Sequence, residues 1–261
     1  MTDSSEAMFK FALGTLAMLL LGRAALEPTQ LTVTKLSLPK GPPLRIAIYS
    51  DLHLAKGKAP LAKLNRALAQ AKPDFIVALG DFSEKPLGEK ELSYLQSISA
   101  VAPTYGVLGN NDLDPQLQKQ LEGSGMTILK NQGVELETKE GRVFLYGVED
   151  LQAGEPNLFG LTQAAAGDFV ILLSHSPEIV RKLEKERVDL ILAGHTHGGQ
   201  LCLPGGYALL THSKLGRKYS SGKYPWGKAT LFITRGVGTS TLPLRLFCLP
   251  ELAILELGER L

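Results

Sequence analysis

The sequence is poor in cysteine and in net charge, and each shortage excludes a class of protein. Its 261 residues include two cysteines, Cys202 and Cys248, which lack the spacing of a metal site and allow at most one bridge. A disulfide scaffold is therefore excluded, and buried thiols or a reducing compartment are expected. A balance of 28 basic and 26 acidic residues leaves a net charge of +2, which gives no reason to expect a nucleic-acid coat. The hydrophobic share of 44% supplies a large core and excludes a disordered chain.

Acidic residues are missing from one long C-terminal stretch. Between Asp189 and Glu251 the sequence has no Asp or Glu. Seven basic residues lie there, namely Lys214, Arg217, Lys218, Lys223, Lys228, Arg235 and Arg245. Tyr219, Tyr224 and Trp226 are interleaved with them. This segment is expected to prefer anions, either a substrate phosphate or lipid headgroups, with an ordinary solvated loop as the alternative.

The N-terminus carries a membrane-type signal. Residues 11–22 are uncharged and mostly apolar, between Lys10 and Arg23. At about 1.5 Å per residue, a helix of this length reaches about 18 Å, short of the roughly 30 Å hydrocarbon core. We interpret residues 1–26 as a hydrophobic segment that is either a membrane anchor or signal-like, and a buried helix is the third alternative. Residues 27–261 are assigned to the domain itself.

Five short apolar runs each stop at a cluster of Asp, Asn or His. They are LRIAIY before residues 50–53, DFIVAL before 80–82, TYGVL before 109–112, FVILL before 174–175, and DLILA before 194–197. Such runs are typical of strands buried on both faces of a parallel sheet. Helical patterns fall between them, over residues 59–71, 88–100 and 177–186. This alternation predicts an α/β fold that presents polar side chains at the carboxyl ends of its strands.

Two regions depart from the alternation. Residues 126–148 contain a hairpin pattern around Lys139-Glu140-Gly141. The last third is rich in strands, with ATLFITRG and ELAILEL as the clearest. The fold class is therefore α/β, and α+β in part, with two sheets in one domain.

The polar clusters together indicate a metal centre. Four of the five histidines lie in them, and His212, the fifth, has no motif around it and is interpreted as a loop residue. Seven oxygen and imidazole donors are too many for one tetrahedral zinc, but they suit two adjacent ions if one carboxylate bridges them. The candidate ligands are Asp51, His53, Asp81, Asn110, His175, His195 and His197.

In this order, these motifs resemble the calcineurin-like metallophosphoesterases. The resemblance rests on Asp51-x-His53, Gly80-Asp81, Gly109-Asn110, His175 and Gly194-His195-x-His197, and it runs from about Arg45 to the C-terminus. It implies a four-layer αββα sandwich of two mixed sheets flanked by helices. It assigns Asp51, His53 and His197 to one metal, Asn110, His175 and His195 to the other, and Asp81 to both. It also implies a hydroxide shared by the metals as nucleophile, with Asp81, Asn110, Asn111 and His195 as catalytic residues.

The sequence departs from the commonest family pattern at Asn111, where the family has a histidine that contacts the scissile phosphate. Asparagine donates a hydrogen bond but delivers no proton at neutral pH. Diphosphates and activated esters, whose leaving groups need a proton least, are therefore favoured substrates. A different acid or a low activity are the alternatives. Besides Asn111, the candidate substrate ligands are Arg235 and Arg245, with structural ion pairs to Glu251 or Glu149 as their alternative role.

GHTHGGQ at residues 194–200 and the segments within 235–251 resemble a bacterial membrane-associated branch that includes UDP-2,3-diacylglucosamine diphosphatases of lipid A synthesis. We therefore expect a metal-dependent phosphoesterase or diphosphatase at the cytoplasmic face of a membrane, acting on a phosphate-containing small molecule or lipid. Mn²⁺ is the first choice of metal because no cysteine ligand is present, with iron, zinc or mixed occupancy as alternatives. The alternative functions are a broad phosphodiesterase on soluble nucleotides or nucleic acid, and a catalytically silent protein-binding scaffold.

Overall fold

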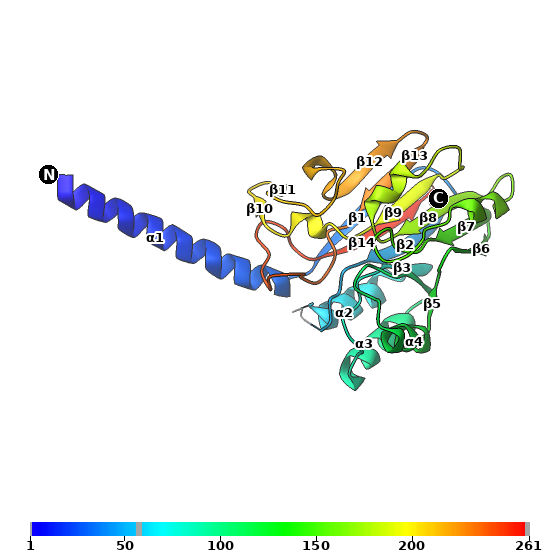
Figure 1. The fold of residues 1–261 in the computed structure, drawn as a ribbon, viewed down its shortest axis with the longest axis horizontal. Coiled ribbons are helices and arrows are strands. Elements are labelled where there is room, and N and C mark those ends of the chain that lie inside the picture. The colour runs from blue at the N-terminus through cyan, green and yellow to red at the C-terminus, as the bar shows by residue number, and fades with distance from the viewer. Residues whose placement is uncertain (1, 56–58, 259–261) are drawn as a thin grey trace.

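Two six-stranded sheets pack face to face, and a long helix projects from one end of the molecule (Figure 1). The computed structural model describes residues 2–55 and 59–258. The first sheet contains, in spatial order, β1 (Thr32–Leu38), β14 (Glu251–Leu257), β2 (Leu44–Tyr49), β3 (Phe75–Leu79), β4 (Thr104–Val107) and β5 (Met126–Ile128). The second contains β12 (Gly222–Trp226), β13 (Ala229–Ile233), β9 (Leu190–Ala193), β8 (Phe169–Ser174), β7 (Gly141–Gly147) and β6 (Gln132–Thr138).

The five runs that precede the polar clusters are all strands. They form β2, β3 and β4, which are parallel neighbours in the first sheet, and β8 and β9, which are parallel neighbours in the second. The expected hairpin is β6–β7, which pairs antiparallel, and β13 and β14 confirm the two C-terminal strands. Both sheets are mixed, because β14 is antiparallel to β2 and β12 is antiparallel to β13. The predicted α/β class with two mixed sheets is confirmed.

Three helices cover the outer face of the first sheet, namely α2 (Leu61–Ala71), α3 (Glu89–Ser99) and α4 (Pro115–Gly123). The first two confirm predicted helices, whereas α4 was not predicted. Its start is nevertheless encoded locally, because the Asp114 side chain accepts hydrogen bonds from the amides of Gln116 and Leu117, and Pro115 occupies the first helical position.

The outer face of the second sheet is covered by short 3₁₀ helices, η2 (Phe159–Gln163) and η3 (Pro177–Arg181). The helix predicted over residues 177–186 is therefore wrong in length and type. Consecutive side chains Ile179 and Val180 are both buried there, so one short turn suffices to cover the sheet.

The main core lies between the two sheets, where Ile46, Val77 and Leu79 of the first sheet meet Leu145 and Ile171 of the second. These aliphatic side chains are fully buried. A smaller ribbon, β10 (Cys202–Leu203) with β11 (Tyr207–Ala208), lies beyond the end of the second sheet, near the short turns η4 (His197–Gly199) and η5 (Arg217–Tyr219). Cys202 of this ribbon and Cys248, which packs with it, are buried and free, as expected for small apolar side chains.

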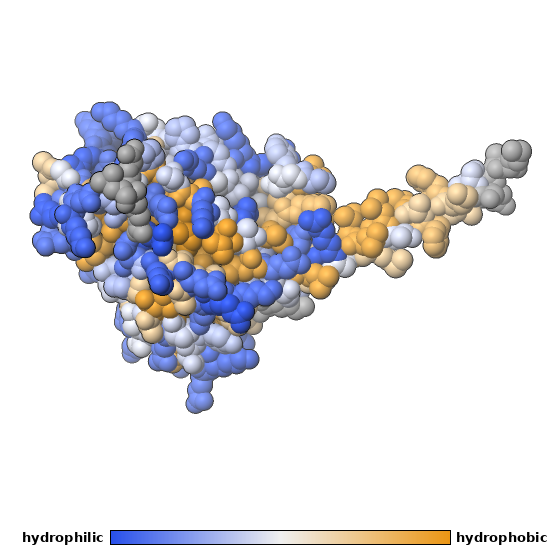
Figure 2. Space-filling view, turned by 180° about the vertical axis from the view of Figure 1, so that it is seen from behind, coloured by the Kyte–Doolittle hydropathy of each residue, from blue (hydrophilic) through white to orange (hydrophobic). Residues whose placement is uncertain are grey.

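The N-terminal helix α1 (Thr2–Leu26) extends away from the domain, and much of its surface is apolar (Figures 1 and 2). Its 25 residues reach about 37 Å, enough for a hydrocarbon core of roughly 30 Å, so the helix is longer than the apolar run alone implies. Large side chains such as Phe11 and Leu19 are 78% and 67% exposed, which excludes the buried-helix alternative. By length and composition this helix fits a membrane span or a signal sequence.

The last turn of α1 nevertheless packs against the domain. Ala24 is buried, and its carbonyl accepts a hydrogen bond from the Arg245 amide. Glu27, in the 3₁₀ turn η1 (Glu27–Thr29), is also buried and accepts a hydrogen bond from the Cys248 amide. The helix therefore leaves the domain at about Arg23, and we call this junction the α1 root.

Candidate metal centre

The predicted ligands follow the strand ends of both sheets and meet between them. Asp51, His53, Asp81, His195 and His197 all have backbone φ angles between 45° and 69°. Non-glycine residues rarely adopt this left-handed region, and such strain is concentrated at functional sites. The loops that follow the strands are thus bent so that their side chains turn back toward one point.

Glycines beside the ligands leave the space that this convergence requires. A Cβ atom added at Gly109 would collide with the Asp81 carboxylate, and one added at Gly194 would collide with Ser50. At Gly80, where φ is +80°, it would lie 2.5 Å from the Gly109 nitrogen. The Gly-Asp, Gly-Asn and Gly-His pairs of the sequence are therefore needed for packing, and Gly80 is needed for its backbone bend as well.

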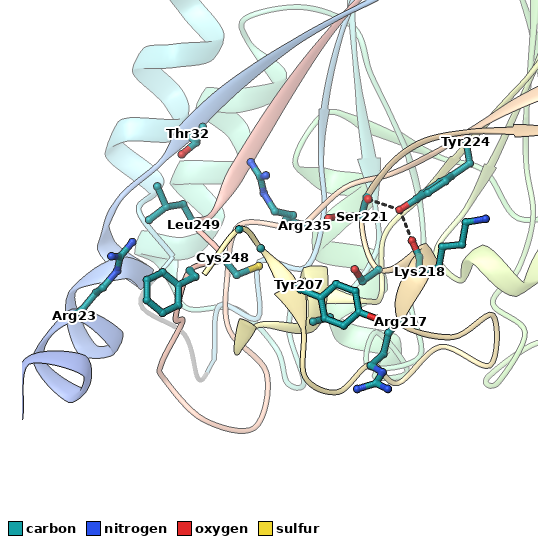
Figure 3. Close-up of a pocket in the computed structure, with 15 residues that line it drawn as sticks. Arg23, Thr32, Tyr207, Arg217, Lys218, Ser221, Tyr224, Arg235, Cys248 and Leu249 are labelled. Carbon is teal, nitrogen blue, oxygen red and sulfur yellow. Dashed lines mark hydrogen bonds between the residues drawn. The ribbon is translucent and has the colours of Figure 1, made fainter. Parts of the chain in front are cut away.

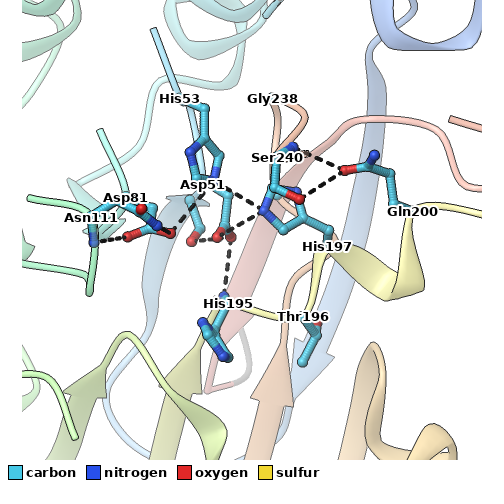
Figure 4. A network of polar contacts seen from close by, with 12 residues as sticks. Asp51, His53, Asp81, Asn111, His195, Thr196, His197, Gln200, Gly238 and Ser240 are labelled. Carbon is cyan, nitrogen blue, oxygen red and sulfur yellow. Dashed lines mark hydrogen bonds and ion pairs between the residues drawn. The ribbon is translucent and has the colours of Figure 1, made fainter. Parts of the chain in front are cut away.

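Two groups of three side chains have ligand atoms within 4.8 Å of one another. One group is Asp51, His53 and His197, and the other is Asp51, Asp81 and His175. Figure 4 shows Asp51, His53, Asp81 and His197 pointing toward a common centre. The Nε2 atoms of His53 and His197 face each other at 3.1 Å, and Asp51 Oδ1 lies 3.5 Å from His197 Nε2.

Asp81 lies between the two halves of the centre. Its Oδ2 atom is 3.5 Å from His53 Nε2 and also 3.5 Å from His175 Nε2. A carboxylate in this position is able to contact two adjacent cations, which agrees with the bridging role that the resemblance implies. Asp51 is an additional shared member, because it belongs to both groups.

The remaining two predicted ligands lie on the second half. His195 Nδ1 is 3.1 Å from His175 Nε2, and the other ring nitrogen of His195 is 3.2 Å from the Gln152 amide. Asn110 lines the same cleft. The structure therefore brings together all seven residues that the sequence singled out as ligands.

The donor set fits divalent cations on two observations. Asp51 Oδ1 and Asn110 Oδ1 are buried and have no hydrogen-bond partner, although buried polar atoms are normally satisfied. Burial lowers the pKa of His175, yet the Asp81 and Asp51 carboxylates raise it well above its ordinary value, which shows that this pocket attracts positive charge. Asp51, His53 and His197 would hold one ion and Asn110, His175 and His195 the other. When bound, such a pair supplies Lewis acidity toward a phosphoryl group.

Contacts behind the ligands orient their rings. His53 Nδ1 is 2.6 Å from the Glu84 carboxylate, and His175 Nδ1 is 2.7 Å from the Leu79 carbonyl. Hydrogen bonds at Nδ1 leave each Nε2 free for a metal. Burial lowers the pKa of His197 to about 3, with Arg245 adding to the effect, so this imidazole stays neutral as a ligand must.

The structure corrects the substrate role expected for Arg245. Its side chain is completely buried, and its guanidinium donates to the carbonyls of Gly238, Arg235 and Cys248. The Nη2 nitrogen, which donates to Gly238 and Arg235, also lies 3.5 Å from His197 Nδ1. With its donors engaged by the protein, Arg245 supports the metal centre from beneath and has no access to a substrate in the cleft.

Arg235 is likewise outside the metal-centre cleft. Its guanidinium pairs with Glu251 at 2.8 Å, which is the structural ion pair that the sequence left open as an alternative. It lines a different cavity, at the α1 root.

Asn111 faces the bridging carboxylate. Its side-chain amide donates to Asp81 Oδ2 at 2.7 Å, and its backbone amide donates to Asp81 Oδ1 at 2.9 Å. Asn111 therefore positions Asp81 in this structure, while it also lines the cleft where a substrate phosphate would lie.

Several residues near the centre were missed by sequence reasoning, among them Glu84, whose contact with His53 is described above. Asp112 is buried and accepts hydrogen bonds from the backbone amides of Gly109, Asp81, Phe82 and Ser83, so it joins two ligand loops. Its place beside Asn110 and Asn111 was a usable signal. Gln152 and His212 line the cleft from distant loops, and nothing in their sequence neighbourhoods marks them.

Comparison with known proteins establishes the family. The model of the calcineurin-like phosphoesterase family matches residues 44–199, and the chain belongs to this family. The chain is 33% identical to the phosphodiesterase YaeI of Escherichia coli (strain K12) over 232 residues, which cover 82% of each protein. It is 29% identical to the uncharacterized metallophosphoesterase YkuE of Bacillus subtilis (strain 168) over 245 residues, which cover 89% of this chain and 85% of the relative.

A likeness to a solved structure supports the fold alone. The crystal structure of TT1561 of Thermus thermophilus matches with a TM-score of 0.53 at 13% sequence identity, covering 75% of this chain and 91% of the other. Together with the family match and the converging ligands, the comparisons define a metal-dependent phosphoester hydrolase with a candidate dinuclear centre.

Proposed function

We propose that the protein hydrolyses a phosphodiester or diphosphate bond of an amphiphilic substrate at a membrane surface, with UDP-2,3-diacylglucosamine as the specific candidate and Mn²⁺ as the metal. One observation carries the choice of substrate. The metal-centre cleft, about 330 Å³ in volume, adjoins an apolar pocket of about 240 Å³. The two share His197, His212, Ser240 and Thr241.

The apolar pocket is lined by leucines whose side chains are exposed to solvent. Leu209, Leu210 and Leu242 are 43%, 80% and 49% exposed, and all three line it. Each methylene group buried on them is worth about 0.8 kcal/mol, so an acyl chain of a substrate would bind there while its phosphate lies at the metal ligands. A soluble nucleotide has no hydrocarbon to place in this pocket.

The metal centre is also close to the α1 root, which supports a membrane site of action. Arg245 donates its amide proton to the Ala24 carbonyl of α1 and places its guanidinium against His197. If α1 is a membrane anchor, this contact holds the cleft near the membrane surface. We place the domain on the cytoplasmic side because both cysteines are free thiols, as is usual in a reducing compartment.

The test is a comparison of substrates with the purified full chain, in uncharged detergent and with Mn²⁺ or a chelator. We expect metal-dependent hydrolysis of bis-p-nitrophenyl phosphate and a higher kcat/KM for UDP-2,3-diacylglucosamine. Leu210→Ser together with Leu242→Ser should lower kcat/KM for the lipid substrate only. Lipid hydrolysis that is slower than that of the aryl ester and insensitive to the leucine substitutions would contradict the proposal.

A second function, hydrolysis of soluble phosphodiesters, is favoured by the name of one relative, the phosphodiesterase YaeI. Single-stranded DNA and a cyclic dinucleotide in the same assay test it directly. Preference for either over the lipid substrate would select this second function. The silent-scaffold alternative predicts no metal-dependent turnover of any substrate. The complete set of metal ligands argues against it.

A further inference from the structure

A large basic cavity lies at the α1 root, apart from the metal centre (Figure 3). Its volume is about 910 Å³, and its cationic lining residues are Arg23, Arg217, Lys218 and Arg235. No Asp or Glu is among its described lining residues, and it shares no lining residue with the metal-centre cleft. We call it the basic cavity.

The charges of the basic cavity are only partly neutralised. Arg23 pairs with Glu27 at 2.6 Å, and Arg235 pairs with Glu251 at 2.8 Å. Among the described residues, Arg217 and Lys218 take part in no ion pair, and their own segment, residues 201–228, contains no acid. About two positive charges are therefore left for a ligand.

The cavity also offers donors that the protein does not use. Arg235 Nε is buried and has no hydrogen-bond partner. Hydroxyl groups of Ser220, Ser221 and Tyr207 belong to the lining residues. Guanidinium groups donate charge-assisted hydrogen bonds to phosphate, and hydroxyl groups add further donors. The uncompensated positive charge of the cavity also attracts a phosphate.

The position of the cavity selects a lipid as the source of that phosphate. Arg23 directly follows the uncharged residues 11–22 of α1, so the cavity lies where an apolar helix would leave the hydrocarbon core. This is the level of the phospholipid headgroups. Leu203 and Tyr207 of the adjacent β10–β11 ribbon are 49% and 57% exposed, which adds apolar contact area beside the cations.

We propose that the basic cavity binds the phosphate of an anionic phospholipid headgroup and so orients the metal-centre cleft toward the bilayer. The inference rests on the proposed membrane attachment of α1 and is independent of the substrate. A soluble phosphate ester carries the same anionic group. The experiment therefore compares a phosphate that carries acyl chains with one that carries none.

The experiment measures binding to the full chain in uncharged maltoside micelles by calorimetry. The probes are dihexanoyl phosphatidylglycerol, dihexanoyl phosphatidylcholine and glycerol 1-phosphate. The test variant combines Arg217→Gln and Lys218→Gln, and the matched control combines Lys185→Gln and Lys228→Gln, which remove the same charge outside the cavity lining. Hydrolysis of bis-p-nitrophenyl phosphate is measured on each protein.

We expect phosphatidylglycerol to bind at least about tenfold more tightly than phosphatidylcholine, and the test variant to lose about 25-fold in affinity, since each of its two basic residues near a lipid surface is worth roughly a fivefold change. The control variant should bind within twofold of the parent. Equal affinity for the two lipids, an equal loss in the control, or glycerol 1-phosphate binding as tightly as phosphatidylglycerol would each overturn the proposal. Failure of the proposed hydrolysis would appear only in the activity assay and would leave the lipid preference unchanged.

Discussion

The metal centre and the surface around the α1 root lie on either side of Arg245, yet their side chains are held very differently. Asp51, His175 and His197 are 0%, 0% and 4% exposed, and glycines and strained backbone fix their positions. On the other side, Tyr207 is 57% exposed and Arg217 belongs to a loop with a single 3₁₀ turn. Side chains in the first region have almost no freedom to change position, whereas those in the second have much.

This contrast separates the reaction from its specificity. A dinuclear centre needs each ligand within a few tenths of an ångström, which a sheet edge supplies. The choice of substrate depends on exposed loops that change without disturbing the sheets. The differences between members of this family should therefore be read from the apolar pocket and the basic cavity, and the reaction from the strand ends.

The largest effect is expected at the residue that both halves of the centre share. Asp81→Asn removes a charge from between His53 and His175, and we expect kcat to fall at least about 10³-fold with loss of bound metal, which corresponds to several kcal/mol of lost Lewis-acid stabilisation. Metal analysis and kinetics with bis-p-nitrophenyl phosphate measure both.

Asp114→Asn is the matched control, because asparagine also caps helices and Asp114 caps α4 away from the cleft. It should leave metal content and rate unchanged. Retention of half the parent rate by metal-stripped Asp81→Asn would contradict a dinuclear mechanism.

The second prediction tests whether the glycines beside the ligands are required for space. Gly109→Ala places a methyl group against the Asp81 carboxylate, so the carboxylate has to move. A displacement of about 1 Å at a catalytic centre can lower the rate about 10²-fold, and we expect kcat to fall by about this factor. Gly123→Ala, in the last turn of α4 with open space around it, is the control and should be neutral in activity. Equal activities of the two variants would show that the loop adjusts freely.

The centre was predictable from the sequence because its geometry follows from strand ends. Each ligand lies two or four residues after an apolar run, and parallel neighbours bring such ends together. The two-sheet fold was predicted from the hairpin pattern and the strand-rich last third added to these runs, and its four layers from the family resemblance. The helix α4 was missed because its nine residues carry few apolar side chains, and the helix expected over residues 177–186 proved to be a single short turn.

The α1 root was not predictable in the same way. Arg235 and Arg245 looked equivalent as basic residues in one acid-free segment, but Arg245 is enclosed by backbone carbonyls and Arg235 reaches Glu251. His212 had no motif, and only the course of its loop brings it to the cleft. Long-range loop packing has no local signal, so charge and residue type alone do not reveal it.

The third prediction concerns the leaving group, which would lie in the metal-centre cleft beside Asn111. With Asn111 in place of an acid, rates should depend steeply on leaving-group pKa across aryl and alkyl phosphodiesters. Asn111→His should accelerate the poorest leaving groups by up to about 10²-fold, the lower end of general-acid catalysis, and good ones little. Because Asn111 also donates to Asp81, metal content has to be matched between the proteins.

His212→Gln is the companion variant, since His212 lines the same cleft. We expect the dependence on leaving-group pKa to be the same with and without His212. A flat dependence in the parent that becomes steep in His212→Gln would instead identify His212 as the acid, and the preference for diphosphates would lose its chemical basis.

The smallest effect is expected where α1 is cut. A chain that begins at Gly22 keeps Ala24 and Glu27, whereas one that begins at Pro28 loses both. The chain that begins at Gly22 should no longer be recovered in the membrane fraction. It should hydrolyse bis-p-nitrophenyl phosphate at a rate within twofold of the full chain. The second should also lose about 1–3 kcal/mol in free energy of unfolding, because the Arg245 and Cys248 amides are left without partners.

Denaturant unfolding of the two shortened chains measures this difference directly, at matched metal content. The contacts of the α1 root hold the loop that carries Arg245, and Arg245 contacts His197. The chain that begins at Pro28 should therefore also bind metal more weakly. Equal stabilities would mean that the last turn of α1 only rests on the domain. In that case the proposed orientation of the cleft toward a membrane would depend on the basic cavity alone.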